Sequence, residues 1–476
     1  MTASNRRARR ARGPLAVVAS LAVVVALLGA CTPDDAEGGT FDTTVDPADC
    51  GLDALAAADE PVTITFWHTL IRSNAEWLEA ATDEFNASQD EVRVELAQQP
   101  SYQDAFTKYK AGLQSGDLPD LVQMEETTVQ QMIDSRSTVP VDACIEADGY
   151  DVSTFVPRAL AYYAAGGVQR AMPWAISNPI LFYDKAKFAA AGLDPEKPPT
   201  TLQELRDASQ ALVDAGVAEH GISLKIAPYI YEFLLAKSGG EYVNNGNGRQ
   251  ARADEANFTS DPSLAILEWW DAMVDDGLAL NTGSDPNNID HLLALTNAGA
   301  AMTIEASSAI GPIEAVLASG DFGDLEVTTA PLPSLEGGGG VPVGDGALWL
   351  PQASSPAKRA AAWRYATFLL SPEQQAGLAV AGGYVPARTD AGDVPLLAEH
   401  WEANPAYRVA YDQLVDGPVD DATVGSLIGD YQAVRNAIRD AMIRILRNGD
   451  DPADAAGDAK AEADIAVQEY NDRVGA

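Results

Sequence analysis

Alternating strand-like and helix-like patterns between residues 62 and 124 constrain the fold of this chain more than any other feature. Residues 62–66 and 92–96 alternate apolar and polar side chains, which is typical of strands with one buried face. Residues 120–124 predict a third strand. Apolar residues three to four positions apart predict a helix in each interval, marked by Leu78, Ala81 and Phe85 and then by Tyr102, Phe106, Tyr109 and Leu113. This order predicts an α/β fold with a parallel, doubly wound sheet.

Ligands of such sheets bind outside the carboxyl ends of the strands. Trp67 and His68 follow the first predicted strand, and Glu125 and Glu126 follow the third. These four residues are therefore the first candidates for a binding site.

A second α/β block is predicted from about Met172 onward. It contains an apolar run at residues 180–183 and another predicted strand at residues 301–304. The segment 200–204 (TTLQE) places Gln or Glu three residues after a threonine, which resembles the capping box of a helix start. Helical patterns dominate from Ala357 to the end.

The first 31 residues have the layout of a bacterial secretory leader. Five arginines precede an apolar run at residues 15–28, and Gly29 and Ala30 then lead to Cys31. The run is too short to cross a bilayer comfortably. A cysteine directly after the small residues predicts cleavage before Cys31 and a lipid on its thiol. The alternative is an ordinary cleaved leader with an incidental cysteine.

Net charge and length bound the function further. Removing residues 1–30 removes five arginines and no acids, so the formal charge falls from −39 to −44. Such an acidic surface repels nucleic acid and anionic membranes and argues against partners of that kind. The roughly 415 residues that follow a polar tether exceed one ordinary core and predict two lobes.

Cys50 and Cys144 remain once Cys31 is assigned to lipid. An even pair in an oxidising compartment predicts one disulfide, with two unpaired buried thiols as the alternative. The four histidines, at positions 68, 220, 291 and 400, are scattered and show no metal-ligand spacing. Neither a metal site nor a cofactor is expected.

The usual signatures of catalysis are missing from the sequence. It contains no G-x-S-x-G, no H-E-x-x-H and no dinucleotide fingerprint, and no lysine follows the glycines at 337–340 as in a phosphate-binding loop. A two-carboxylate glycosidase stays open, since acidic pairs are abundant. We expect a binding protein and not an enzyme.

Several segments, in family order over about 400 residues, resemble one known family. They are residues 64–68 (ITFWH), 119–126 (PDLVQMEE), 173–183 (PWAISNPILFY), 190–199 (AAGLDPEKPP), 301–303 (AMT) with 306–308 (ASS), 346–349 (GALW), 383–386 (GYVP) and 430–435 (DYQAVR). The chain resembles the extracellular solute-binding proteins of the maltose-binding-like cluster, the receptors of ABC importers. Within the cluster it is similar to the glycerol-3-phosphate- and glycerophosphodiester-binding lipoproteins.

The resemblance implies a type II periplasmic-binding-protein fold, in which two lobes, each a sheet flanked by helices, are joined by hinge strands. The family's ligand contacts match Tyr102, Glu126, Ser177, Ser307, Tyr384 and Arg435 in this sequence. Arginine presents a planar fork of donors to a phosphate, hydroxyl groups complete the phosphate's hydrogen bonds, and glutamate accepts from glycerol or sugar hydroxyls. Trp67, Trp174 and Tyr229 are candidates for stacking on a sugar.

Each contact has an ordinary structural alternative. Arg435 lies on a helix whose buried stripe contains Val434, Ile438, Met442 and Ile445, and a flanking arginine of such a helix is usually solvated. The other matched residues are equally compatible with core packing, turns or helix caps.

The sequence departs from the family pattern in two places. Two tryptophans that the family has in the region of residues 225–228 are absent, although Tyr229 and Tyr231 partly replace them. Asp345 stands where the family has a glycine that contacts the ligand. A carboxylate there repels a phosphate dianion and favours a ligand with a cationic group, such as glycerophosphocholine. A neutral oligosaccharide stays open as the alternative.

These observations predict a lipid-anchored, monomeric receptor on the outer face of the cell membrane, which delivers a phosphorylated glycerol or sugar to the permease of an ABC importer. The expected division is 1–30 leader, 31–60 flexible tether, 61–171 with 304–356 first lobe, and 172–303 with 357–476 second lobe. Hinge crossings are expected near 171–173, 303–306 and 356. Rival classes are an oligosaccharide receptor, a secreted hydrolase and a structural surface lipoprotein.

Overall fold

The computed structural model describes residues 41–285, 288–297, 299–319 and 325–475. The predicted leader and Cys31 lie outside the described residues. The described residues belong to one compact unit. No helix among them is long and apolar enough to cross a membrane.

The parallel core predicted from the sequence is present. β1 (Val62–His68) pairs in parallel with β2 (Val92–Gln98) on one side and with β3 (Leu121–Glu125) on the other. The connecting helices are α2 (Arg72–Ser88) and α3 (Tyr102–Ser115), and α2 buries Leu78, Ala81 and Phe85 as expected. The carboxyl ends of β1 and β3 therefore lie at one edge of the sheet.

The remainder of this sheet is antiparallel, so the parallel pairing predicted from the sequence extends only over β1, β2 and β3. β13 (Gly344–Pro351) lies beside β3 and runs antiparallel to it, to β4 (Thr138–Val139) and to β7 (Met172–Ser177). The chain leaves this sheet after β7 and returns as β13 more than 160 residues later. It then enters from the opposite end of the strands, which reverses the direction of β13.

A second sheet has the strand order β10-β9-β11-β8-β12. Its strands are β8 (Pro179–Asp184), β9 (His220–Leu224), β10 (Ala279–Asn281), β11 (Ala300–Ala306) and β12 (Val327–Pro331). β9, β10 and β11 are parallel, whereas β8 is antiparallel to both β11 and β12. We call the part built on the six-stranded sheet the first lobe and the part built on this sheet the second lobe.

Sheet membership places three segments differently from the expected division. β7, which contains Met172, belongs to the first sheet, whereas residues 304–306 of β11 and the whole of β12 belong to the second. The chain crosses between the sheets at Ser177–Pro179, between β12 and β13, and again after α15.

Helices cover the sheets as follows. α4 (Val129–Ser135), α5 (Asp142–Asp148), α6 (Pro157–Tyr162), α14 (Pro356–Leu369) and α15 (Pro372–Gly382) pack with the first sheet or its helices. The second sheet is accompanied by α7 (Lys185–Ala190), α8 (Leu202–Asp214), α9 (Pro228–Lys237), α10 (Asn244–Gly248), α11 (Asp261–Asp275), α12 (Asp290–Thr296), α17 (Val409–Asp416), α18 (Tyr431–Asn448) and α19 (Pro452–Val474). α13 (Ile310–Ser319) and α16 (Pro395–Ala403) contact α15.

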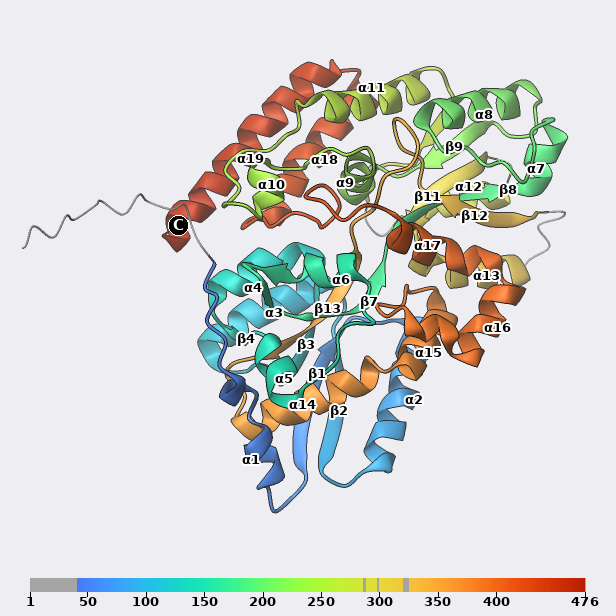
Figure 1. Ribbon diagram of the computed structural model, residues 1–476. Helices are drawn as coiled ribbons and strands as arrows, with labels where there is room; N and C mark the ends of the chain where they lie inside the picture. Colours follow the sequence, from blue (N-terminus) through green and yellow to red (C-terminus); the bar gives the residue numbers. More distant parts are fainter. Residues whose placement is uncertain (1–40, 286–287, 298, 320–324, 476) are drawn as a thin grey trace, which may run out of the picture. The chain divides into compact units, whose positions relative to one another are not determined.

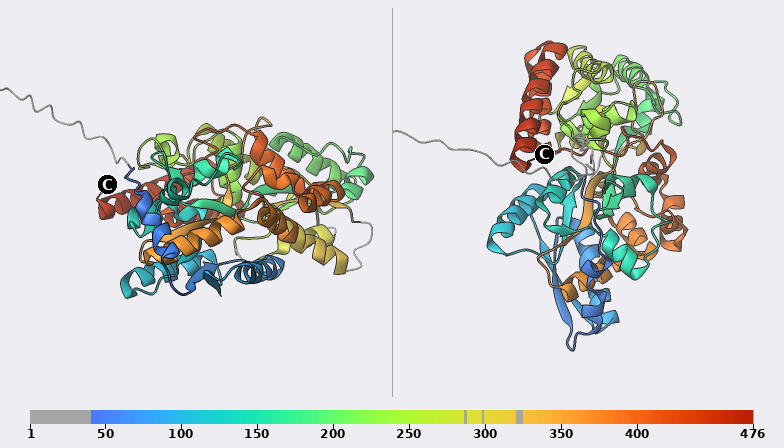
Figure 2. Two further views of the ribbon diagram at one scale, coloured as in Figure 1. Left: turned by 60° about the horizontal axis from the view of Figure 1, so that its bottom comes forward. Right: turned by 60° about the vertical axis from the view of Figure 1, so that its left-hand side comes forward.

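The C-terminal helices are thus divided between the lobes and do not all join the second. α14 contacts β1, whereas α18 and α19 pack against each other and against α11 (Figures 1 and 2). The start of α8 has the capping box predicted from the sequence, formed by Thr201 and Glu204. Short elements complete the fold: η1 (Pro47–Cys50), α1 (Leu52–Ala56), β5 (Ala164–Ala165), β6 (Val168–Gln169), η2 (Glu126–Thr128), η3 (Ser307–Ala309), η4 (Asp390–Asp393) and η5 (Pro405–Arg408).

A disulfide fixes the N-terminal arm to the first lobe. Cys50 at the end of η1 is bonded to Cys144 in α5, and both side chains are fully buried. Gly51, which follows, has φ +78°, and a Cβ there would lie 2.3 Å from the backbone oxygen of Pro356. Ordered structure therefore begins before Val62, and residues 47–56 belong to the folded unit.

We expect the double substitution Cys50→Ala, Cys144→Ala to lower the free energy of unfolding by about 2–5 kcal/mol, because the bond closes a long loop in the unfolded chain. The sequence separation of the two cysteines is 94 residues. Urea denaturation of the variant and of the wild-type protein, with and without reductant, measures the effect. Equal stability in all samples would contradict a stabilising role.

Candidate ligand-binding site

Arg435 is held by a buried carboxylate of its own lobe. It lies on the first turns of α18, and its Nε and Nη2 donate to the two carboxylate oxygens of Glu232 on α9 at 2.8 and 2.7 Å. Its guanidinium also lies over the ring of Tyr431, 5.0 Å from the ring centre. The arrangement is a bidentate pair, the strongest geometry for an arginine and a carboxylate.

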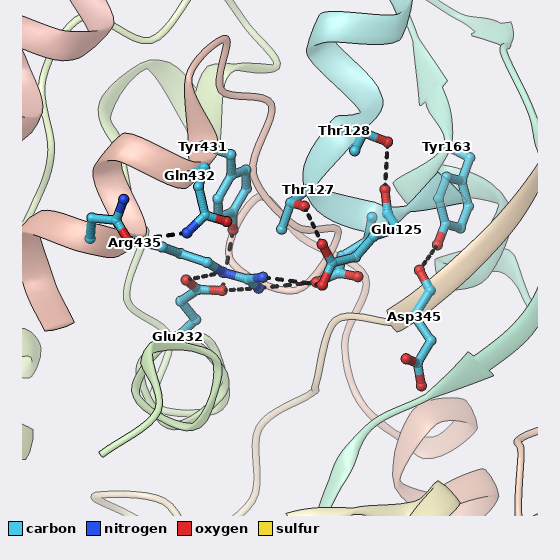
Figure 3. A network of polar contacts seen from close by, with 11 residues as sticks. Glu125, Thr127, Thr128, Tyr163, Glu232, Asp345, Tyr431, Gln432 and Arg435 are labelled. Carbon is cyan, nitrogen blue, oxygen red and sulfur yellow. Dashed lines mark hydrogen bonds and ion pairs between the residues drawn. The ribbon is translucent and has the colours of Figure 1, made fainter. Parts of the chain in front are cut away.

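The same guanidinium reaches the first lobe. Nη2 lies 3.0 Å from Oε1 of Glu126, and Nη1 lies 3.5 Å from Oε1 of Glu125 (Figure 3). Glu125 is the last residue of β3, and Glu126 begins η2. Arg435 therefore joins the strand end predicted to carry the site to the second lobe.

Three carboxylates share this one guanidinium. Burial and then the neighbouring charge of Glu125 raise the pKa of Glu126, against the opposite effect of Arg435. Burial works against the charged form of Arg435, but the carboxylates, Glu232 foremost, raise its pKa further. One carboxylate oxygen of Glu126 is buried without a hydrogen-bond partner among the described residues.

Asp345 on β13 adds a fourth carboxylate to the junction of the two lobes, where its charge acts on Glu126. Its backbone has φ +67°, a conformation that residues other than glycine rarely adopt. The pairing of β13 with β7 shifts register immediately after it. Tyr163 donates to its backbone oxygen at 3.1 Å. Burial, together with the charges of Glu125 and Glu305, raises the pKa of Asp345 to about 6, and nearby Ser177 opposes the shift.

Tyr102 and Tyr384 face this carboxylate. Tyr102 begins α3, and its hydroxyl oxygen accepts from Nε2 of Gln123 at 2.9 Å. Tyr384 follows Gly383, the C-cap of α15. Burial and then the charge of Asp345 raise the pKa of both phenols, and the two hydroxyls interact with each other.

Ser307 lies next to Gly383, the residue that precedes Tyr384. Its amide donates to the backbone oxygen of Asn178, while its buried hydroxyl has no partner among the described residues. A Cβ on Gly383 would lie 2.7 Å from the backbone oxygen of Ser307, so this close approach requires glycine. The structure thus gathers all six matched residues, Tyr102, Glu126, Ser177, Ser307, Tyr384 and Arg435, around the junction of the two lobes.

The three stacking candidates have different surroundings. The ring of Trp67 is covered by Lys108, whose Nζ lies 3.8 Å from the ring centre. Trp174 is fully buried against Phe66. Tyr229 does reach the site, where its hydroxyl donates to Glu305. In this conformation Trp67, Trp174 and His68 are core residues. Burial lowers the pKa of His68 to about 4.

Glu232, Glu305 and Lys225 were not identified from the sequence. Glu305 lies 2.7 Å from His291 and 3.6 Å from Lys225, and these neighbours help to lower its pKa to about 2 although burial opposes this. Glu232 stands in a helix whose other residues from 230 to 236 are all apolar. That isolated charge was a signal that could have predicted a buried partner.

A cavity of about 20 Å³, enough for about one water molecule, lies beside the Arg435 cluster. Its lining includes Glu126, Tyr162, Glu232, Tyr242 and Tyr431. No group of three or more potential metal ligands occurs among the described residues. The site can offer hydrogen bonds, charge and aromatic surface to a small solute.

Comparisons with known proteins identify the family of this chain. The family of bacterial extracellular solute-binding proteins matches residues 80–409. The sn-glycerol-3-phosphate-binding periplasmic protein UgpB of Escherichia coli O6:K15:H31 is 25% identical over 396 residues, covering 81% of this chain and 88% of that protein.

Two solved structures share the fold. UgpB from Mycobacterium tuberculosis, in complex with glycerophosphocholine, has a TM-score of 0.70 at 20% identity, covering 87% of this chain and 99% of that one. The sugar-binding protein MalE from Xanthomonas citri has a TM-score of 0.74 at 18% identity, with the same coverage. The fold is that of the type II periplasmic binding proteins. This chain belongs to the bacterial extracellular solute-binding proteins, the receptors that deliver small solutes to ABC permeases.

Proposed function

We propose that this receptor is anchored by a lipid on Cys31 and captures a glycerophosphodiester, such as glycerophosphocholine, between its two lobes. Glycerol-3-phosphate is the simpler ligand of the same class. The lipid anchor is supported by the leader and by the cysteine after Gly29 and Ala30. The family assigns delivery to a permease, and no chemical step is required of this chain.

The choice of ligand rests on the charges of the site. Arg435 supplies a cation for a phosphate, while Asp345 places a carboxylate with an unpartnered buried oxygen in the same cleft. A phosphodiester has one negative charge, and a cationic head group brings its own positive charge. Two unit charges 4 Å apart interact by about 4 kcal/mol at an effective dielectric constant of 20. The second charge of a phosphate monoester is therefore costly beside Glu125 and Glu126.

A neutral oligosaccharide is the second candidate, for one specific reason. Glu232 and Glu126 already accept hydrogen bonds from Arg435, so the guanidinium is partly satisfied without a ligand. Free carboxylate oxygens and tyrosines also suit sugar hydroxyls. MalE from Xanthomonas citri is a sugar-binding protein of the same fold.

A thermal-shift screen with glycerol-3-phosphate, glycerophosphocholine, maltose and trehalose tests the proposal. We expect glycerophosphocholine to give the largest stabilisation, since a ligand at 100 times its Kd adds about 2.7 kcal/mol. Arg435→Ala should weaken its binding by about 2–4 kcal/mol through loss of a charge-assisted contact.

Arg439→Ala is the matched control, because Arg439 lies one turn further along α18 and pairs with the adjacent Asp440 at the surface. Stabilisation by maltose or trehalose alone would overturn the choice of ligand and retain the receptor. Stabilisation by none of the four would leave the phosphodiester assignment without support.

The raised pKa of Asp345 predicts that the affinity for the ligand depends on pH. If the carboxylate with a pKa of about 6 faces a cationic head group, the ligand binds its ionised form. Affinity should then rise by up to about tenfold per pH unit between pH 5 and 6 and level off above pH 7. Isothermal titration of glycerophosphocholine across this range measures the slope.

Asp345→Asn is the control for that slope, because asparagine tolerates φ +67° and cannot ionise. Its affinity should be weaker and independent of pH in the same interval. A wild-type affinity that does not change from pH 5 to 7 would rule out a cation at Asp345.

A further inference from the structure

Glu232 occupies the side of Arg435 that a phosphate would otherwise use. Its two oxygens accept from Nε and Nη2, and Glu126 accepts from Nη2 as well. Nη1 has the loosest contact, 3.5 Å to Glu125. The guanidinium therefore offers a ligand one nitrogen and not its bidentate edge.

Burial stabilises the ion pair between Arg435 and Glu232. The Glu232 side chain is 7% exposed and that of Arg435 12% exposed, so neither exchanges its partner for water without a large cost. Glu232 is the single charged residue between positions 228 and 236 of α9, so its neighbours on that helix offer no other cation. Even without Glu126, whose pKa burial raises, Glu125 and Glu232 outnumber the arginine by one negative charge.

We propose that Glu232 determines the charge of the ligand that the site accepts: it keeps Arg435 in position but partly neutralised, so that the cleft takes a singly charged phosphodiester and rejects a doubly charged phosphate monoester. This inference rests on the proposed function. It predicts more than that function, since it assigns the discrimination to one residue, which acts through its pair with Arg435.

The test measures the affinities of glycerophosphocholine and glycerol-3-phosphate for the wild-type protein and for Glu232→Gln at pH 7.5. The amide keeps a hydrogen bond to Arg435 but removes one negative charge. We expect glycerol-3-phosphate to gain at least tenfold more affinity than glycerophosphocholine, because a dianion feels the lost charge twice as strongly. Glu268→Gln, in α11, is the control and should leave the ratio unchanged.

If Glu232→Gln does not fold, Glu125→Gln should shift the same ratio in the same direction, since Glu125 is the carboxylate at Nη1. An unchanged ratio in a folded variant that binds glycerophosphocholine overturns the role of Glu232. Absence of binding by both phosphate ligands in every variant overturns the proposed function instead.

A separate contact joins the lobes away from the ligand residues. Asp134 at the end of α4 accepts from both terminal nitrogens of Arg252 and, at 3.0 Å, from the hydroxyl of Tyr470 on α19. α4 follows η2 of the first lobe directly, whereas the segment of Arg252 is held to α19 by Asn471 and Asp464. A Cβ on Gly429 would lie 2.0 Å from the ring of Tyr470, so the ring fits only over glycine.

We infer that Asp134, Arg252 and Tyr470 form a clasp that stabilises the described arrangement of the lobes, in which they touch, without ligand. Its contribution raises the fraction of binding-competent molecules, and apparent affinity is proportional to that fraction. The three residues are positioning residues and touch no predicted ligand contact.

Asp134→Asn should therefore open the ligand-free protein and weaken glycerophosphocholine binding threefold or more. Small-angle scattering of the ligand-free protein measures the opening as a larger radius of gyration. Asp390→Asn is the matched control, because Asp390 makes a similar pair with Arg388 within the first lobe. Unchanged scattering and affinity in Asp134→Asn overturn the clasp, and scattering decides it even if this ligand does not bind.

Discussion

The pairing of β13 with three other strands is the constraint on which most of the structure depends. β13 lies between β3 and β4 and also pairs with β7, so it completes the first sheet with a segment that arrives after the entire second sheet. A sheet strand left unpaired exposes its backbone donors and acceptors. The return of β13 thus fixes two crossings between the lobes and places Asp345 opposite the carboxyl end of β3.

The electrostatics of the cleft follow from that geometry. Strand ends of the first lobe supply Glu125 and Glu126, β13 supplies Asp345, and the second lobe supplies Glu232 with Arg435. Carboxylates this close are stable only when cations, hydrogen bonds or protons compensate for their charges. The site is therefore organised around the shortage of positive charge, and a ligand that contributes its own cation fits it better than a dianion.

Local pattern explained the parts of the fold that are made from neighbouring residues. β1, α2, β2, α3 and β3 arise from periods of two and of three to four, and the capping box at Thr201 is a three-residue signal. The antiparallel direction of β13 and the division of α14 and α15 from α18 and α19 depend on long-range pairing. No local period encodes which of two sheets an apolar strand or helix joins.

The sequence by itself determined the chemical types at the cleft, through Glu126 at a strand end, the hydroxyl groups of Tyr102, Ser177, Ser307 and Tyr384, and Arg435 on its helix. Only the tertiary structure decided how those groups are engaged. Glu232 binds Arg435 across 203 positions of sequence, and Trp67 and Trp174 are enclosed by packing. The partner of a buried charge is set by proximity in space, because a low-dielectric interior requires each charge to find compensation nearby.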